Sequence, residues 1–199
     1  MRNLSMLMPA LALGIAGLTV AANSSRATPI TYTETATATG SLGAVTFTDA
    51  AVTLTMMNDT VNVMNPMSGL FVNFGTTTIT VSGFAPATFT DQTEVFSNQS
   101  VSAVGFRDAT ISRDILDVSS ASFAAYALTT PIGPISGTAL FNSGQSFPTT
   151  GGAFILSSVT GPTATFTAAT TAVPEPASLT LLGLALAGLG AAIRCRRMF

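Results

Sequence analysis

Apolar and polar residues alternate with a period of two through the middle of the chain. The clearest stretch is residues 30–39, where Ile30, Tyr32, Ala36 and Ala38 alternate with threonines. Successive side chains of a strand point to opposite faces, so this pattern predicts a half-buried β-strand. Further strands are expected at residues 44–48, 52–56, 61–64, 70–74, 78–82, 88–90, 101–106, 109–112, 122–128, 135–141, 153–159 and 163–167.

Turn-forming residues separate many of these segments, including Asn58-Asp59, Asn65-Pro66 and Gly161-Pro162. Many short strands at intervals of about 8–12 residues are typical of sandwiches and jelly rolls. The sequence therefore predicts an all-β fold: a single antiparallel β-sandwich or jelly-roll-like domain over residues 28–172. One helical turn is expected within residues 108–120.

Residues 1–27 have the three parts of a signal peptide. Arg2 supplies the positive start, residues 4–22 the apolar stretch, and Ser25-Arg26-Ala27 a small-x-small cleavage site. Val20-Ala21-Ala22 is a second candidate site, and an uncleaved anchor helix is the alternative. We expect cleavage, because the small-residue site follows the apolar stretch directly.

A second apolar stretch covers residues 177–193 and is followed at once by basic residues. As a helix it would span roughly 25 Å, slightly less than the hydrocarbon core of a bilayer. A buried core helix is the alternative, but cations directly after the stretch favour a membrane helix with that flank in the cytoplasm. The predicted membrane residues are Leu179, Leu181, Leu182, Leu184, Leu186, Leu189 and Ile193, and the predicted cytoplasmic stop is Arg194, Arg196 and Arg197.

Pro174, Glu175 and Pro176 stand directly before this stretch. Two prolines around a glutamate favour an extended segment that a protease can read. The order of Pro-Glu-Pro tag, short apolar segment and arginine cluster resembles the PEP-CTERM sorting signal, also called the ice-binding protein C-terminal domain. That second label describes the tail and is no indication of ice binding.

This resemblance implies export from the cytoplasm of a Gram-negative bacterium and recognition by an exosortase. Pro174, Glu175 and Pro176 would be the recognition tag within a sorting tail at residues 173–199. The expected partners are Sec-type export machinery, signal peptidase, exosortase and exopolysaccharide, with the inner membrane as a transient anchor. The body would lie in the periplasm and then at the cell surface or in the extracellular matrix.

The charge of the predicted domain excludes one class of function. Residues 28–172 carry eight carboxylates and two arginines, a net charge of −6. Nucleic-acid binding needs clustered cations that displace counterions from phosphates, so we expect no nucleic-acid partner. The single cysteine, Cys195, allows no intramolecular disulfide.

The sequence contains few side chains that could carry out catalysis. The chain has no His and no Lys, which excludes a Ser-His-Asp triad, a His-ligated zinc site and a lysine base. Carboxylates cluster at Asp108, Asp114 and Asp117 and at Asp91 with Glu94, but neither group has the spacing of a calcium loop. We expect no enzyme and no cofactor, with calcium as a weaker possibility and surface ion pairs with Arg107 and Arg113 as the simpler interpretation.

Three functions remain open for the domain. The first is a non-enzymatic surface or matrix protein, the second a polysaccharide-binding module, with or without calcium, and the third a hydrolase that uses Asp and Glu. Thirteen Phe with two Tyr and no Trp favour a packed core over a sugar-stacking site. Threonine ranks can form ice-binding surfaces, but strand propensity explains residues 31–39 more simply.

Overall fold

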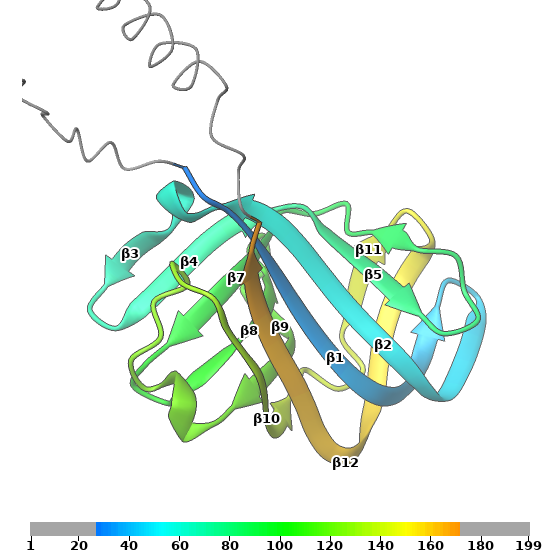
Figure 1. The fold of residues 1–199 in the computed structure, drawn as a ribbon. Coiled ribbons are helices and arrows are strands. Elements are labelled where there is room, and N and C mark those ends of the chain that lie inside the picture. The colour runs from blue at the N-terminus through cyan, green and yellow to red at the C-terminus, as the bar shows by residue number, and fades with distance from the viewer. Residues whose placement is uncertain (1–26, 172–199) are drawn as a thin grey trace, which may run out of the picture.

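A computed structural model describes residues 27–171 (Figure 1). Within them the fold is all-β, as predicted, with two short 3-10 helices. The strands are β1 (Pro29–Leu42), β2 (Val45–Asp59), β3 (Met64–Met67), β4 (Leu70–Gly75), β5 (Thr77–Val81), β6 (Ala87–Thr88), β7 (Thr93–Asn98), β8 (Ala103–Asp108), β9 (Arg113–Ser119), β10 (Ile132–Leu140), β11 (Ser146–Thr149) and β12 (Gly152–Thr170). The 3-10 helices are η1 (Thr60–Asn62) and η2 (Ala121–Phe123).

All twelve strands belong to one curled antiparallel sheet. Its order is β3-β4-β7-β8-β9-β10-β12-β1-β2-β5-β6, and β11 pairs with β12 outside this path. Hydrogen bonding therefore does not divide the strands into the two separate sheets of the predicted sandwich. The physical reason is the length of β1, β2 and β12, which have 14, 15 and 19 residues and run through both halves of the molecule (Figure 1).

Irregularities in the pairing bend these long strands. The register of β1 against β12 shifts between Ala36 and Ala38, which leaves residues 160–163 of β12 without partners on β1. The register of β1 against β2 shifts between Ala38 and Gly40. Extra residues in one strand of a pair kink it and increase its twist, and β12 changes direction sharply near its label in Figure 1.

One half of the sheet closes on itself around phenylalanines. An isolated bridge joins Phe89, just after β6, to Thr149 of β11, so the strands β1, β2, β5, β6, β11 and β12 form a closed ring. The rings of Phe47 and Phe89 each contact Phe154, with centroids 6.3 and 6.1 Å apart. We call this half the phenylalanine end.

The other half contains both tyrosines of the described residues. The Tyr32 hydroxyl donates to the carbonyl of Leu128 at 2.7 Å and accepts from the Asn73 side chain at 3.1 Å. Phe123 and Tyr126 contact the ring of Phe166. These contacts hold the segment between β9 and β10 over the sheet, and we call this half the tyrosine end.

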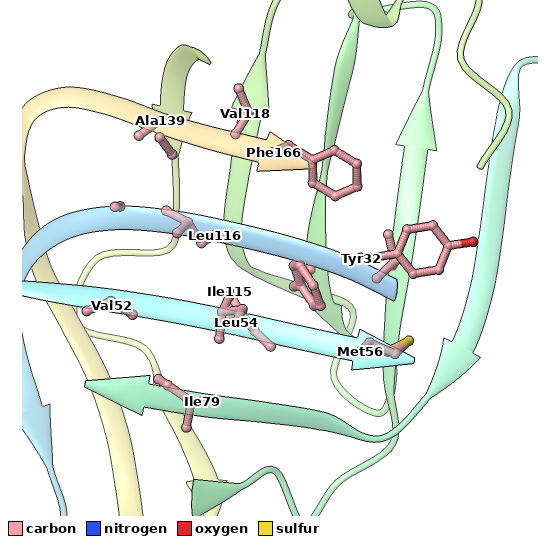
Figure 2. Close-up of a cluster of buried hydrophobic side chains, with 14 of the residues drawn as sticks. Tyr32, Val52, Leu54, Met56, Ile79, Ile115, Leu116, Val118, Ala139 and Phe166 are labelled. Atoms are coloured by element: carbon pink, nitrogen blue, oxygen red, sulfur yellow. The ribbon is translucent and has the colours of Figure 1, made fainter. Parts of the chain in front are cut away.

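A single core joins the two ends. Figure 2 shows side chains of β1, β2 and β5 meeting those of β9, β10 and β12 in one cluster. Tyr32, Leu54, Ile115, Leu116 and Phe166 are almost fully excluded from solvent there. The positions predicted to alternate on residues 30–39 point their apolar members into this core, which confirms that part of the prediction.

Some predicted elements are wrong. Residues 109–112 form a turn between β8 and β9, and residues 122–128 belong to η2 and the loop after it rather than to strands. The helical turn expected within residues 108–120 is also absent, because residues 113–119 form β9. The strand expected at residues 61–64 overlaps β3 only at Met64, because residues 60–62 form η1. The turns expected at Asn58-Asp59, Asn65-Pro66 and Gly161-Pro162 instead lie within β2, β3 and β12. Three strands, β7, β9 and β11, were missed.

Candidate functional site

The two ends of the described body lie side by side. Ile30 of β1 pairs with Thr170 of β12, and the backbone nitrogen of Thr171 donates to the carbonyl of Pro29 at 3.1 Å. The described body therefore begins and ends at the same place, in the half that we call the tyrosine end (Figure 1). The predicted tag at residues 174–176 follows within three residues of this point.

The predicted signal peptide (except Ala27), the tag, the membrane residues 179–193 and the arginines at 194, 196 and 197 lie outside the described residues. Among the helical segments of residues 27–171, none has the length and apolar content that a membrane crossing requires.

The acidic cluster expected from the sequence is divided between separate roles. Asp108 is fully buried at the end of β8, where one of its carboxylate oxygens accepts hydrogen bonds from the backbone nitrogens of Thr110 and Ile111 at 2.9 and 3.3 Å. This carboxylate therefore stabilises the turn into β9. Asp91 lies in the bend before β7.

Glu94 and Arg107 form an ion pair between neighbouring strands. They stand opposite each other on β7 and β8, and the Arg107 guanidinium donates to a carboxylate oxygen of Glu94. The guanidinium also lies 5.5 Å from the centre of the Phe96 ring, a cation–π arrangement. Glu94 is almost fully buried while Arg107 is partly exposed, so the pair is a fixed structural contact at the sheet surface.

Asp117 lies over a glycine on the neighbouring strand. Gly105 is its cross-strand partner, and a Cβ atom at Gly105 would lie 2.6 Å from an oxygen of the Asp117 carboxylate. Burial raises the pKa of Asp117 well above its usual range, and the nearby Asp114 raises it further. Burial also raises the pKa of Asp114, although Arg107 opposes that shift.

Glu34 is a buried acid that the sequence analysis did not single out. It lies on β1 between Leu54 of β2 and Phe166 of β12, and all three side chains are fully buried. Neither of its carboxylate oxygens has a hydrogen-bond partner. Burial raises its pKa well above the usual range, and the charge of Asp117 adds to the shift. The signal was present in the sequence, since Glu34 occupies the buried register of Ile30, Tyr32 and Ala36.

These carboxylates do not converge on a shared site. Within residues 27–171 no three acidic side chains come close enough together to hold a metal ion. Asp108, Asp114 and Asp117 are thus near each other in sequence but do not form such a group of acidic side chains. Glu34 and Asp117 are both closed off from solvent, so they offer a dissolved substrate no accessible carboxylate.

Two cross-strand rows of hydroxyls cover the face of the long strands that points away from the core. Cross-strand pairing aligns side chains of β10, β12, β1, β2, β5 and β6 on one face. We call this surface the threonine face. Its first row is Ser136, Thr165, Thr35, Thr53 and Thr80, and its second row is Thr167, Thr33, Thr55, Thr78 and Thr88.

The threonine face is uncharged and regular. Neighbouring strands are about 5 Å apart, and alternate residues along a strand about 7 Å, so the hydroxyls and methyls form a grid. Within the described residues, one side-chain hydrogen bond joins members of the rows, between Ser136 and Thr165 at 2.7 Å. A shallow hollow lies in this face, lined by Thr35, Thr37, Ala51, Thr163 and Thr165 among others.

Comparison with known proteins gives one match, outside the described body. The family model described as the PEP-CTERM protein-sorting motif matches residues 172–197. No curated protein and no solved structure matches the chain. The motif implies an exported protein with a membrane-anchored precursor, processed by exosortase for the cell surface. The resemblance inferred from the tag, the apolar segment and the arginines is thus confirmed: the chain carries a PEP-CTERM protein-sorting motif.

Proposed function

We propose that this chain is a non-enzymatic protein of the cell surface or extracellular matrix, delivered through its sorting motif. The observation that carries the proposal is the motif at residues 172–197. In this proposal the signal peptide directs export, residues 179–193 hold the precursor in the inner membrane, and Arg194, Arg196 and Arg197 stay in the cytoplasm. Exosortase then recognises Pro174, Glu175 and Pro176 and releases the body from the periplasmic face.

The position of the chain ends supports this delivery route. Both ends of the body leave the tyrosine end together, through the pairing of Ile30 with Thr170. A single tether can therefore carry the body without passing across the threonine face or the phenylalanine end. Removal of the tail leaves every strand of the sheet intact, because β12 ends at Thr170, before the motif begins.

The contacts of the acidic residues support a non-enzymatic body. Two-carboxylate catalysis needs one acid and one base that both reach the substrate. In the described body Asp108 stabilises a turn, Glu94 pairs with Arg107, and Glu34 and Asp117 are buried. All four carboxylates are buried, so none of them is placed to reach a dissolved substrate.

Mass spectrometry of the mature protein from the native organism tests the proposed route. We expect wild-type protein cut near residues 174–176, and Glu175→Ala or Pro176→Ala to shift most of the protein to an uncut precursor that retains Phe199. Pro162→Ala is the matched control, because it replaces an exposed proline of β12 outside the motif. A wild-type mature protein that still ends in Phe199 would contradict release, and activity of a purified body on glycans would contradict the non-enzymatic role.

A second candidate function, binding of an uncharged polysaccharide, is favoured by the threonine face. Hydroxyls can exchange hydrogen bonds with sugar hydroxyls, and threonine methyls can contact the apolar face of a sugar ring. Adjacent strands in a sheet twist by about 20–25°, so a surface of six strands does not match a flat, rigid lattice such as ice. A flexible polymer can follow such a twist.

Binding to neutral glycans, measured with and without a chelator, tests this second candidate. Thr35 and Thr165 line the hollow. The substitutions Thr35→Val and Thr165→Val remove their hydroxyls while keeping the branched shape of the side chains. At about 1 kcal/mol per hydrogen bond, each should weaken binding about fivefold. Thr90→Val, an exposed threonine outside both rows, should not. Unchanged affinity in the two hollow variants would exclude the face, and loss of binding with chelator would indicate calcium.

A further inference from the structure

Exposed apolar side chains concentrate in one short segment of the body. Met57, Val61, Met64 and Met67 are 70%, 49%, 49% and 64% exposed. We call residues 57–67 the exit segment. It comprises the last three residues of β2, then η1 and β3. The other large exposed apolar side chains of the described body are dispersed over separate elements: Val45, Val101, Ile111 and Leu140.

Isolated exposed apolar residues are normal on protein surfaces, whereas a concentration of them indicates a contact surface. The exit segment contains one charged residue, Asp59, and no cation. Methionine is flexible and polarizable and packs against irregular surfaces, so three methionines in eleven residues suit an adaptable, apolar partner.

The exit segment lies beside the place where both chain ends leave the body. Asp59 pairs with Pro29, and the backbone nitrogen of Thr60 donates to the carbonyl of Thr28 at 3.0 Å. Pro29 in turn accepts from the nitrogen of Thr171. Figure 1 shows η1 and β3 on the same side of the molecule as the two departing ends.

The tail is short enough to hold this segment against the membrane. If residues 177–193 cross the bilayer, as the proposed function requires, six residue steps separate Thr171 from the start of the crossing at Ala177. A fully extended chain of that length covers at most about 20 Å. The tyrosine end must therefore remain near the outer surface of the bilayer for as long as the precursor is anchored.

We propose that the exit segment is a membrane-contact surface, with its methionines and Val61 in the interfacial layer of the lipid while the tail anchors the precursor. The lipid it fits is zwitterionic, because the body carries a net charge of −6 and anionic headgroups would repel it. This inference rests on the proposed function, since the tether brings the segment to the lipid. Contact also orients the body, so that the phenylalanine end points away from the membrane.

The absence of tryptophan from the chain makes a direct test possible. The full precursor, reconstituted in phosphatidylcholine vesicles, would carry a single reporter as Met64→Trp or, as the matched control, Val45→Trp. Val45 is 58% exposed and begins β2 at the far end of β1. We expect brominated phosphatidylcholine to quench the reporter at position 64 several-fold more than the reporter at position 45. Met67→Trp repeats the measurement at a second exposed methionine, in case the first variant fails to fold.

Vesicle flotation and bromine quenching together distinguish the membrane contact of the exit segment from the membrane anchoring on which it rests. Precursor that floats with the vesicles but shows equal quenching at positions 64 and 45 overturns the membrane contact and leaves the anchoring intact. A blue-shifted reporter at position 64 without bromine quenching also overturns it, because the segment would then be covered by protein, such as residues 177–193. Precursor that does not float with the vesicles overturns both the anchoring and the contact.

Discussion

Glu34 shows how one residue couples this fold to pH. Its carboxyl group is fully buried between Leu54 and Phe166 without a hydrogen-bond partner, and burial raises its pKa well above the usual range in the folded protein. In the unfolded chain the same group ionises near its ordinary pKa of 4.5. Above that pH the unfolded chain binds fewer protons than the folded one, and the free energy of unfolding therefore falls as pH rises.

Glu34→Gln should remove this dependence. We expect the variant to resemble the wild type near pH 4 and to become increasingly more stable than the wild type as pH rises above 4.5 toward the raised pKa of the folded state, because an amide has no charged form. One group changes the slope by at most about 1.4 kcal/mol per pH unit. Urea unfolding at several pH values measures it, and parallel stability curves for the two proteins would contradict the buried-acid interpretation. Asp117 leaves a residual slope of the same sign in the variant, because its pKa is also raised.

The acidic residues also show the limit of reading a site from sequence spacing. Asp108, Asp114 and Asp117 predicted a cluster because they lie within ten residues. The turn at residues 109–112 instead places Asp108 at the end of β8 and the other two on β9. Alternation in β1 could have identified Glu34 as buried, whereas its proximity to Asp117 depends on tertiary packing that no local pattern contains.

At the scale of elements, the alternation of β1 predicted that strand well, whereas β7 and β9, in which buried polar residues interrupt the apolar pattern, were missed. β7 carries Thr93, Glu94 and Ser97 among its buried residues, and β9 carries Asp117. Such residues interrupt the apolar signal, although the structure buries them through the contact with Arg107, hydrogen bonds and the space over Gly105. The strand prediction for residues 122–128 failed for the opposite reason. Tyr126 and Leu128 gave an apolar signal because they are buried, but they lie in a loop rather than in a strand.

The threonine face is a property of strand pairing rather than of any one strand. Residues 30–39 predicted a single rank, and the sequence contains no signal that Thr35 stands opposite both Thr53 and Thr165. That alignment depends on the bulges in the long strands, which shift the register by whole residues. The surface emerges only when six strands are placed in order.

At the scale of the molecule, we expect the long strands to make the two ends one cooperative unit. The chain has two tyrosines, Tyr32 and Tyr126, and both lie in the tyrosine end. Tyrosine fluorescence therefore reports that end alone, while far-UV circular dichroism reports the whole sheet. Because β1, β2 and β12 cross both ends, we expect the two signals to follow a single transition.

The substitution Phe154→Ala, in the phenylalanine end, tests this cooperativity. Phe154 is fully buried in the phenylalanine end, and its truncation should cost about 3–5 kcal/mol. We expect the midpoint of tyrosine fluorescence to shift together with that of circular dichroism, as it should for Phe123→Ala in the tyrosine end. A fluorescence midpoint that stays in place while circular dichroism becomes biphasic would show that the ends unfold separately.

The adjacency of β1 and β12 has a consequence for the order of events during export. The first strand to cross the membrane pairs along most of its length with the last, so the centre of the sheet waits for residues 152–170. Pairing partners so far apart in the chain form slowly, because a long loop must close first. Strands β4, β7, β8 and β9 can pair with one another earlier, but the sheet becomes complete only when nearly the whole body has been exported.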